Sequence, residues 1–280
     1  MSPGKDADYI LGAGADEQER LRAQGDAVGP ITERLLQQAG IGRGMRVLDL
    51  GCGAGDVSIL LARLVGPDGE VVGVDREAAM LDKARDRISG LGLTQVSFLE
   101  SDFRRLGSQL EKFDAAVGRL VLMYQADPVE AVKAAASQVR PGGVVLFQEY
   151  DSTVPPTSLL PLPLHEQVRH WIWETLRRSG TDAQMGFQLY AVFVAAGLPA
   201  PEVRAEAIVQ TPATRYPGVA LVRVLLPRMV EYGIATQAEV DVDTLEQRLI
   251  AERTTANATY IGQLVFGAWA RLPTRASATR

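Results

Sequence analysis

The sequence of 280 residues predicts an α/β fold with a doubly wound, mostly parallel, seven-stranded sheet. Five short apolar runs alternate with helix-like segments between residues 45 and 150, which is the pattern of a parallel sheet with helices on both faces. The first run stops in a glycine-rich turn at 51–55, and a helical apolar pattern begins directly after it. Two more strand-like segments follow at about 202–210 and 260–270.

The first 150 residues contain an N-terminal helical region and the alternating part. Residues 5–40 carry apolar residues at helical spacing, among them Ile31 and Leu35, and Gly40 ends this region. Turn residues bound each short apolar run, so we predict a strand for each run and a helix after the first, second and fourth. The predicted strands are 45–50, 70–75, 95–99, 113–118 and 144–149. The predicted helices are about 55–65, 77–90 and 128–139.

The pattern changes after residue 150. Residues 151–163 are rich in Pro, Ser and Thr, and helices are predicted at about 164–179 and 184–196. Residues 215–252 are also predicted to be helical, with Pro227 as a kink or a boundary. We therefore expect a helical insertion, able to cover a site on the sheet, before the last strand.

Charge and composition narrow the classes of function. The net charge of −5 argues against nucleic acid as the main partner, because phosphate binding favours a basic surface. The first residues show no signal-peptide pattern, and no run of about 18 apolar residues could span a membrane. The one cysteine, Cys52, excludes an intramolecular disulfide. We expect a soluble, cytoplasmic protein that binds neither nucleic acid nor membrane.

The glycine-rich turn Gly51–Gly55 is the strongest functional signal. Parallel sheets bind ligands beyond the carboxyl ends of their strands, and glycines let a ligand lie on the backbone at a helix N-terminus. The turn therefore predicts a nucleoside-cofactor site. A nicotinamide or flavin site would have a third glycine at position 56, where this sequence has Asp56, so a dinucleotide site is disfavoured.

The string Val47–Gly55 (VLDLGCGAG) resembles the first motif of class I S-adenosylmethionine-dependent methyltransferases. Asp75 ends the second strand, Asp102 follows the third, and Arg140–Gly143 precedes the fifth, in the order and at the spacing of that family. The resemblance covers about residues 40–150. It implies a Rossmann-like methyltransferase fold with S-adenosylmethionine as the cofactor and no metal.

The resemblance also implies roles for residues around the cofactor. Asp49 would contact the ammonium, the amides of the turn the carboxylate, Asp75 the ribose hydroxyls and Asp102 the adenine. These three acids also have simpler interpretations, because Asp49 could cap the turn, Asp75 could cap the helix at 77–90, and Asp102 could be a plain turn residue. Cys52 is interpreted as a small residue in a tight turn. The expected cofactor-binding residues are Asp49, Gly51, Cys52, Gly53, Asp75, Arg76, Met80, Ser101, Asp102, Phe103, Arg119 and Tyr124.

The acceptor side is less defined. Methyl transfer needs the nucleophile held in line with the methyl group in a dry pocket, and a base only if the nucleophile keeps a proton. Glu149, just past the fifth strand, and His165 are the candidate catalytic groups, although Glu149 could equally be a solvated strand end. Several relatives have paired histidines after the fourth strand, where this sequence has Met123-Tyr124. The candidate substrate contacts are Tyr9, Tyr124, Tyr150 and Trp171.

The sequence therefore predicts a methyltransferase of ubiquinone/menaquinone or natural-product type, acting on O or N, less readily C, of a small molecule. The alternative is a non-methylating enzyme or binding protein that keeps the cofactor on the same fold. The expected parts are an N-terminal helical cap (1–40), a cofactor-binding core (41–150), a substrate-binding lid with late core elements (151–252), and a last strand with the tail (253–280). A homodimer is also expected.

Overall fold

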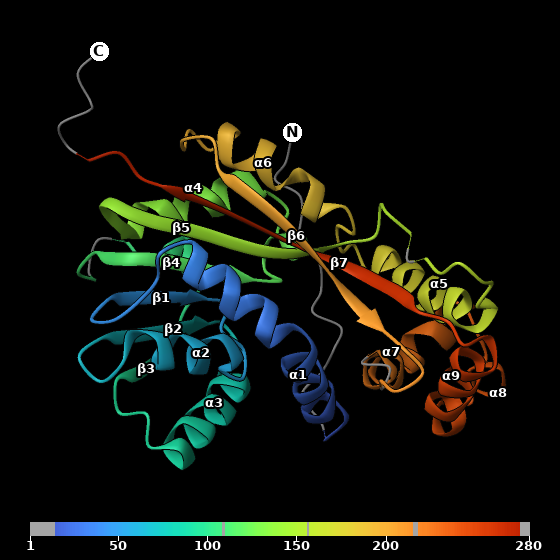
Figure 1. Cartoon of the computed structure of the whole chain (residues 1–280). Helices are drawn as coiled ribbons and strands as arrows, with labels where there is room; N and C mark the ends of the chain where they lie inside the picture. The colour runs from blue at the N-terminus through green and yellow to red at the C-terminus, as the bar shows by residue number, and fades with distance from the viewer. Residues whose placement is uncertain (1–14, 108–109, 156, 215–217, 275–280) are drawn as a thin grey trace.

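The computed structural model describes residues 15–107, 110–155, 157–214 and 218–274 (Figure 1). Tyr9, an expected substrate contact, lies outside these residues. Among the helices of the described ranges, none is long and apolar enough to cross a membrane.

The described strands form a seven-stranded sheet in the order β3-β2-β1-β4-β5-β7-β6. Strands β1 to β5 pair in parallel, whereas β7 pairs antiparallel with both β5 and β6. The predicted mostly parallel sheet is therefore confirmed. The strands are β1 (Arg46–Leu50), β2 (Glu70–Asp75), β3 (Val96–Glu100), β4 (Phe113–Arg119), β5 (Val139–Asp151), β6 (Glu202–Gln210) and β7 (Tyr260–Arg271).

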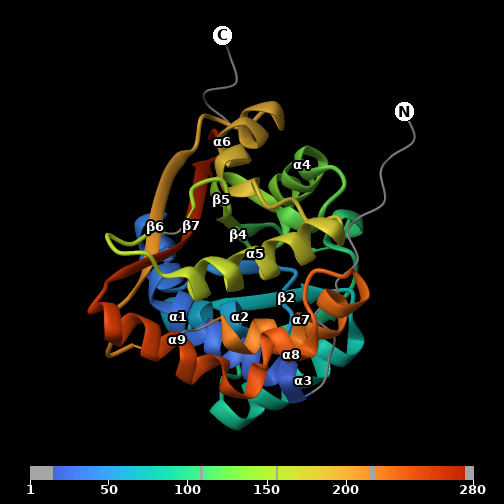
Figure 2. The same ribbon diagram turned by 90° about the vertical axis from the view of Figure 1, so that its right-hand side faces the viewer.

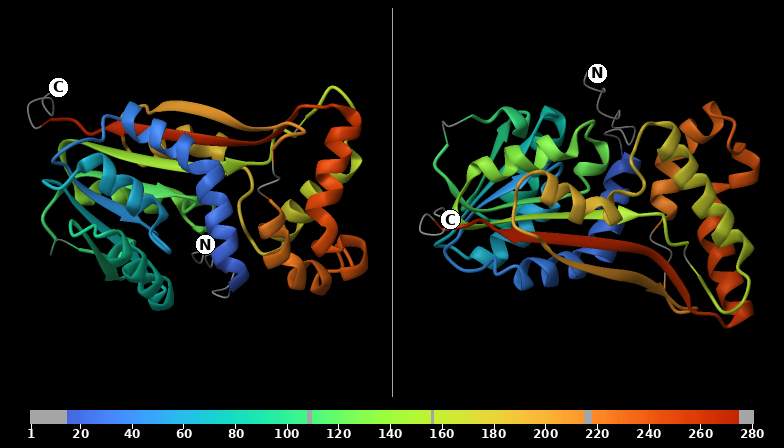
Figure 3. Two further views of the ribbon diagram at one scale, coloured as in Figure 1. Left: turned by 60° about the horizontal axis from the view of Figure 1, so that its bottom comes forward. Right: turned by 90° about the horizontal axis from the view of Figure 1, so that it is seen from above.

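Helices cover both faces of the sheet (Figures 1 and 3). On one face lie α1 (Ala15–Gln38), α2 (Asp56–Val65) and α3 (Ala78–Leu91), and on the other α4 (Pro128–Gln138) and α6 (Met185–Ala195). Successive residues of β1 point to opposite faces of the sheet, which is why both faces need a cover. Val47 shares an apolar cluster with Leu36 of α1, whereas Leu48 belongs to the cluster on the opposite face. The period-two pattern of a buried strand thus supplies two apolar layers.

Helix α6 is part of the sheet packing and lies within residues 151–252, for which a lid with late core elements is predicted. Phe193 meets Phe147 of β5 edge to face, with ring centroids 6.2 Å apart. The ring centroid of Phe187 lies 4.8 Å from that of Phe266 of β7. These aromatic contacts fix α6 on the face that it shares with α4.

The remaining helices gather beyond the end of the long strands (Figures 1 and 2). They are α5 (Pro163–Arg178), α7 (Val219–Glu231), α8 (Gln237–Val240) and α9 (Val242–Ala256). Pro227 lies inside α7 and does not end it. Two short 3-10 turns complete the fold, η1 (Phe103–Arg105) after β3 and η2 (Leu122–Tyr124) after β4.

Candidate functional site

A cavity of about 170 Å³ opens at the carboxyl ends of β1, β2, β3 and β4. Its walls are the turns that follow these four strands. Every residue that the sequence predicts at the cofactor lines it, which is expected because parallel strands bring their carboxyl ends to one edge. These residues are Asp49, Gly51, Cys52, Gly53, Asp75, Arg76, Met80, Ser101, Asp102, Phe103, Arg119 and Tyr124.

The glycine turn between β1 and α2 needs its glycines for two reasons. Gly51, Gly53 and Gly55 all have positive φ angles, of 61°, 52° and 83°, which residues with a Cβ adopt only with strain. A Cβ on Gly51 would also lie 2.9 Å from Cγ2 of Val121. The backbone of the turn is therefore the surface that faces the cavity, next to the positive end of α2.

The carboxylate of Asp75 joins two turns at the edge of the cavity. Its Oδ2 accepts a hydrogen bond of 2.8 Å from the Gly53 amide, and its Oδ1 accepts one of 2.9 Å from the Glu77 amide. Each carboxylate oxygen keeps a further lone pair for a ligand hydroxyl. Because α3 begins at Ala78, Asp75 supports the turn before the helix as well as the glycine turn.

Asp49 places a buried carboxyl group at the base of the cavity. Its side chain is 1% exposed, and Ser58 of α2 donates a hydrogen bond of 2.5 Å to its Oδ2. Burial raises the pKa of Asp49 to about 7, against the opposing effects of the Ser58 hydrogen bond and the Arg119 charge. A positively charged ligand group would stabilise the ionised form.

We expect this raised pKa to appear in the pH dependence of stability. The contribution of Asp49 is complete below its unfolded pKa of about 4 and is lost as the pH rises to its folded pKa of about 7. The unfolding free energy of the wild type should therefore fall relative to that of Asp49→Asn, by up to about 1.4 kcal/mol per pH unit in this range. Urea unfolding of both proteins at several pH values measures the difference, and a pH-independent difference would contradict the assignment.

Asp102 and Cys52 also have defined states in the cavity wall. The guanidinium of Arg104 donates to both carboxylate oxygens of Asp102, at 2.7 Å for the shortest contact, and lowers the pKa of that carboxyl group. Burial raises the pKa of the Cys52 thiol. The thiol is therefore protonated at neutral pH, in agreement with its interpretation as a small packing residue.

The segment after β4 supplies residues that the sequence did not predict. Leu120, Val121 and Gln125 line the cavity beside Arg119 and Tyr124. Leu120 has a φ of 56°, unusual for a residue with a branched side chain. The available signal was their position, since they follow a strand that ends at the same edge as the glycine turn.

The structure places neither candidate base on the cavity wall. Glu149 is fully buried on β5, and its carboxyl group accepts hydrogen bonds from the amides of Val121, Leu122 and Met123. It is therefore no solvated strand end.

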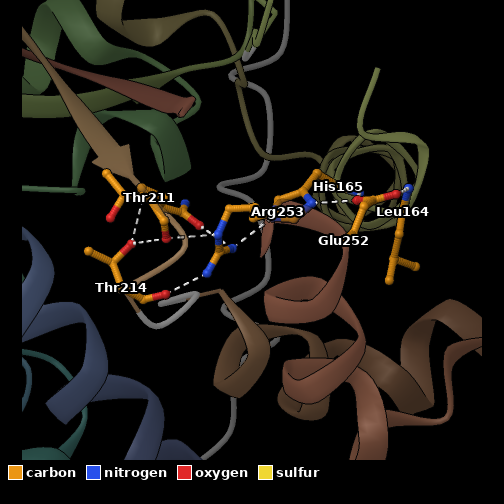
Figure 4. Close-up of polar contacts among 7 residues, drawn as sticks. Leu164, His165, Thr211, Thr214, Glu252 and Arg253 are labelled. Atoms are coloured by element: carbon orange, nitrogen blue, oxygen red, sulfur yellow. Dashed lines mark hydrogen bonds and ion pairs between the residues drawn. The ribbon is translucent and has the colours of Figure 1, made fainter. Parts of the chain in front are cut away.

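His165 is fully buried in α5, within the group of helices beyond the sheet (Figure 4). Its Nε2 lies 2.8 Å from a guanidinium nitrogen of Arg253, which can only donate, so Nε2 accepts and Nδ1 donates to Glu252 at 2.6 Å. Burial lowers the pKa of His165, which keeps the ring neutral. With both ring nitrogens engaged, the imidazole ties α5 to α9.

The same network reaches the end of β6. Arg253 donates to the side chain of Gln210 and to the carbonyls of Thr211 and Thr214 (Figure 4). The carboxylate of Glu252 also accepts from the Leu164 amide at the start of α5. These contacts hold the helices to the sheet, which is a structural role.

Two expected substrate contacts also lie away from the cavity. Trp171 is buried within the largest apolar cluster. Tyr150 packs on the same cluster and also on a smaller one that includes Val28 and Ile31 of α1. The structure thus supports packing roles for both side chains. Of the expected substrate residues, Tyr124 alone lies on the cavity wall within the described part of the chain.

Comparison with known sequences identifies the family of the chain. A family model described as a methyltransferase domain matches residues 41–193. The ubiquinone/menaquinone biosynthesis C-methyltransferase UbiE of Pseudomonas paraeruginosa is 35% identical over 126 residues, which make 45% of this chain and 48% of that protein. The chain therefore spans about half the length of the curated relatives it matches.

Solved structures share the fold at low sequence identity. A SAM-dependent methyltransferase from Aquifex aeolicus aligns with a TM-score of 0.51 at 15% identity, covering 86% of this chain and 88% of that one. The [4+2]-cyclase SpnF aligns with a TM-score of 0.52 at 18% identity, covering 96% and 87%. With more than half of its residues matched by the family model, the chain belongs to the class I S-adenosylmethionine-dependent methyltransferase domain family.

Proposed function

We propose that the protein transfers the methyl group of S-adenosylmethionine to a small molecule, at O or N in preference to C, in the biosynthesis of a secondary metabolite. The observation that carries the proposal is the meeting of the glycine turn, Asp49 and Asp75 in one cavity. A homodimer stays a prediction.

The residues of the cavity fit this cofactor by the chemistry of their donors and acceptors. Asp49 would hold the ammonium, and the turn amides with the N-terminus of α2 the carboxylate. Asp75 would accept from the ribose hydroxyls with the lone pairs that the Gly53 and Glu77 amides leave open. Bound S-adenosylmethionine would supply a methyl group on a sulfonium centre.

In this proposal the apolar segment after β4 lies next to the small molecule that receives the methyl group. Leu120, Val121 and Tyr124 would exclude water from the reacting groups and align the nucleophile with the methyl group. Because the carboxyl group of Glu149 and the ring of His165 are engaged elsewhere, alignment in a dry pocket carries the proposed catalysis.

Methyl transfer tests the proposal directly. We expect the protein to move a labelled methyl group from S-adenosylmethionine to at least one member of a panel of phenols, amines and hydroquinones, with release of S-adenosylhomocysteine. The Asp75→Ala variant is the control for transfer that depends on the cavity. Tight cofactor binding without transfer to any panel member would instead favour a non-methylating enzyme or binding protein on this fold.

A further inference from the structure

We infer that Glu149 is a positioning residue, whose carboxyl group holds the backbone of Val121–Met123 and thereby presses the cavity wall against the glycine turn. This inference rests on the proposed binding of S-adenosylmethionine. In place of the predicted role as a base, Glu149 would act through Val121, which lines the cavity, without touching the ligand itself.

Three consecutive amides converge on this one side chain. The amides of Val121 and Leu122 donate to Oε1 of Glu149 at 3.0 Å and 2.8 Å, and the Met123 amide lies 3.4 Å from Oε2. Glu149 is 0% exposed, so solvent does not reach these contacts in the folded protein. Buried amides without an acceptor are costly, and the conformation of the turn therefore depends on this carboxyl group.

The neighbouring backbone is strained and is held from the same strand. Leu120 has a φ of 56°, and its amide donates to the carbonyl of Gln148 on β5 at 2.8 Å. Such a conformation persists only where its surroundings impose it. Adjacent residues of β5, Gln148 and Glu149, together impose the path of the chain after β4.

Val121 transmits this constraint to the cofactor side. Its Cγ2 lies 2.9 Å from the position that a Cβ on Gly51 would take, so its side chain rests directly on the glycine turn. Both residues line the cavity. A shift of the Val121 backbone would therefore change the contact that shapes the turn.

The protonation state of Glu149 suggests a conservative variant. Burial raises the pKa of its carboxyl group to about 8, so this group is mostly protonated at neutral pH. The amide of glutamine has the same shape and keeps an oxygen that can accept from Val121 and Leu122. Only the 3.4 Å contact of the Met123 amide, the longest of the three, loses its acceptor. Glu149→Gln should therefore preserve the wall, whereas Glu149→Ala removes both acceptors.

The experiment compares the affinity of these variants for S-adenosylhomocysteine by calorimetry, with thermal unfolding measured in parallel. We expect Glu149→Ala to bind at least about tenfold more weakly than wild type, and Glu149→Gln within about threefold of it. The matched control is Asp151→Ala, since Asp151 is a buried carboxylate of the same strand that accepts from the Thr153 and Phe187 amides. It should lose stability and keep its affinity.

The outcomes separate a positioning residue from a base and from a merely structural residue. A folded Glu149→Ala variant with wild-type affinity would overturn the inference, and a base would leave binding intact in both variants while abolishing transfer in both. If Glu149→Ala does not fold, Glu149→Asp, which withdraws the carboxyl group by one methylene, must show the loss instead. Wild-type protein that does not bind S-adenosylhomocysteine would contradict the proposed function itself.

A double-mutant cycle tests the route through Val121. Val121→Ala by itself should weaken the binding of S-adenosylhomocysteine. Adding Glu149→Ala to that variant should weaken binding little further, because both substitutions disrupt the contact of Val121 with the glycine turn. Losses that multiply in the double variant would contradict transmission through Val121.

Discussion

Gly51→Val is expected to weaken the binding of S-adenosylhomocysteine by at least about 100-fold. The residue has a φ of 61°, and any Cβ there would come within 2.9 Å of Val121. The valine side chain would be forced against Val121, which lines the cavity beside Gly51, and would distort the bare backbone on which the ligand is proposed to lie. Calorimetric titration of the purified variant measures the loss, and circular dichroism shows whether the fold survives.

Gly92→Val is the matched control for backbone strain. Gly92 ends α3 with a φ of 67°, and a Cβ there would have no neighbour within 4 Å. Both substitutions should cost at least about 1–2 kcal/mol of stability, because both place a side chain in the left-handed region. Only Gly51→Val should lose affinity. Normal binding by a folded Gly51→Val variant would show that the cofactor does not lie on this turn.

Asp75→Ala is expected to lose about 1.5–3 kcal/mol of affinity for S-adenosylhomocysteine, the range for hydrogen bonds to a charged group. The substitution removes the proposed partner of the ribose hydroxyls and also the acceptor of the Gly53 amide. This loss corresponds to about tenfold to 150-fold in the dissociation constant. Fluorescence or calorimetric titration is sensitive enough for this range.

Asp82→Ala is the matched control for Asp75→Ala, because it removes a carboxyl group from α3, the helix that follows Asp75. Asp82 is an exposed residue of α3 that pairs with Arg85 at 2.8 Å, and such surface pairs contribute little. Its affinity should equal that of the wild type. If Asp75→Ala also bound normally, the role of Asp75 would be limited to supporting the two turns.

The cofactor side could be predicted from the sequence because local rules determine it. The run Arg46–Leu50 is mostly apolar and glycines follow it, so both the strand and the turn after it can be recognised without tertiary information. The parallel order of the strands then brings Asp49, Asp75 and Asp102 to one edge. Each of these positions follows from a strand end, which the pattern of turn residues locates well.

The roles of Glu149 and His165 could not be predicted in this way, because their partners are distant in sequence. The partners of His165 lie 87 and 88 residues away, on a helix that packs beside it only in the folded chain. The three amides bound by Glu149 precede it by 26 to 28 residues, and their direction depends on the positive φ of Leu120. A sequence pattern shows that a side chain follows a strand, but the tertiary fold decides what the side chain meets.

Titration of the wild-type protein with S-adenosylhomocysteine and, separately, with NAD⁺ decides which cofactor the cavity binds. The glycine turn with Asp56 at the position of a third dinucleotide glycine predicts saturable binding of S-adenosylhomocysteine. NAD⁺ should give no binding heat under the same conditions. Saturable binding of NAD⁺ with no binding of S-adenosylhomocysteine would contradict the assignment of the cavity.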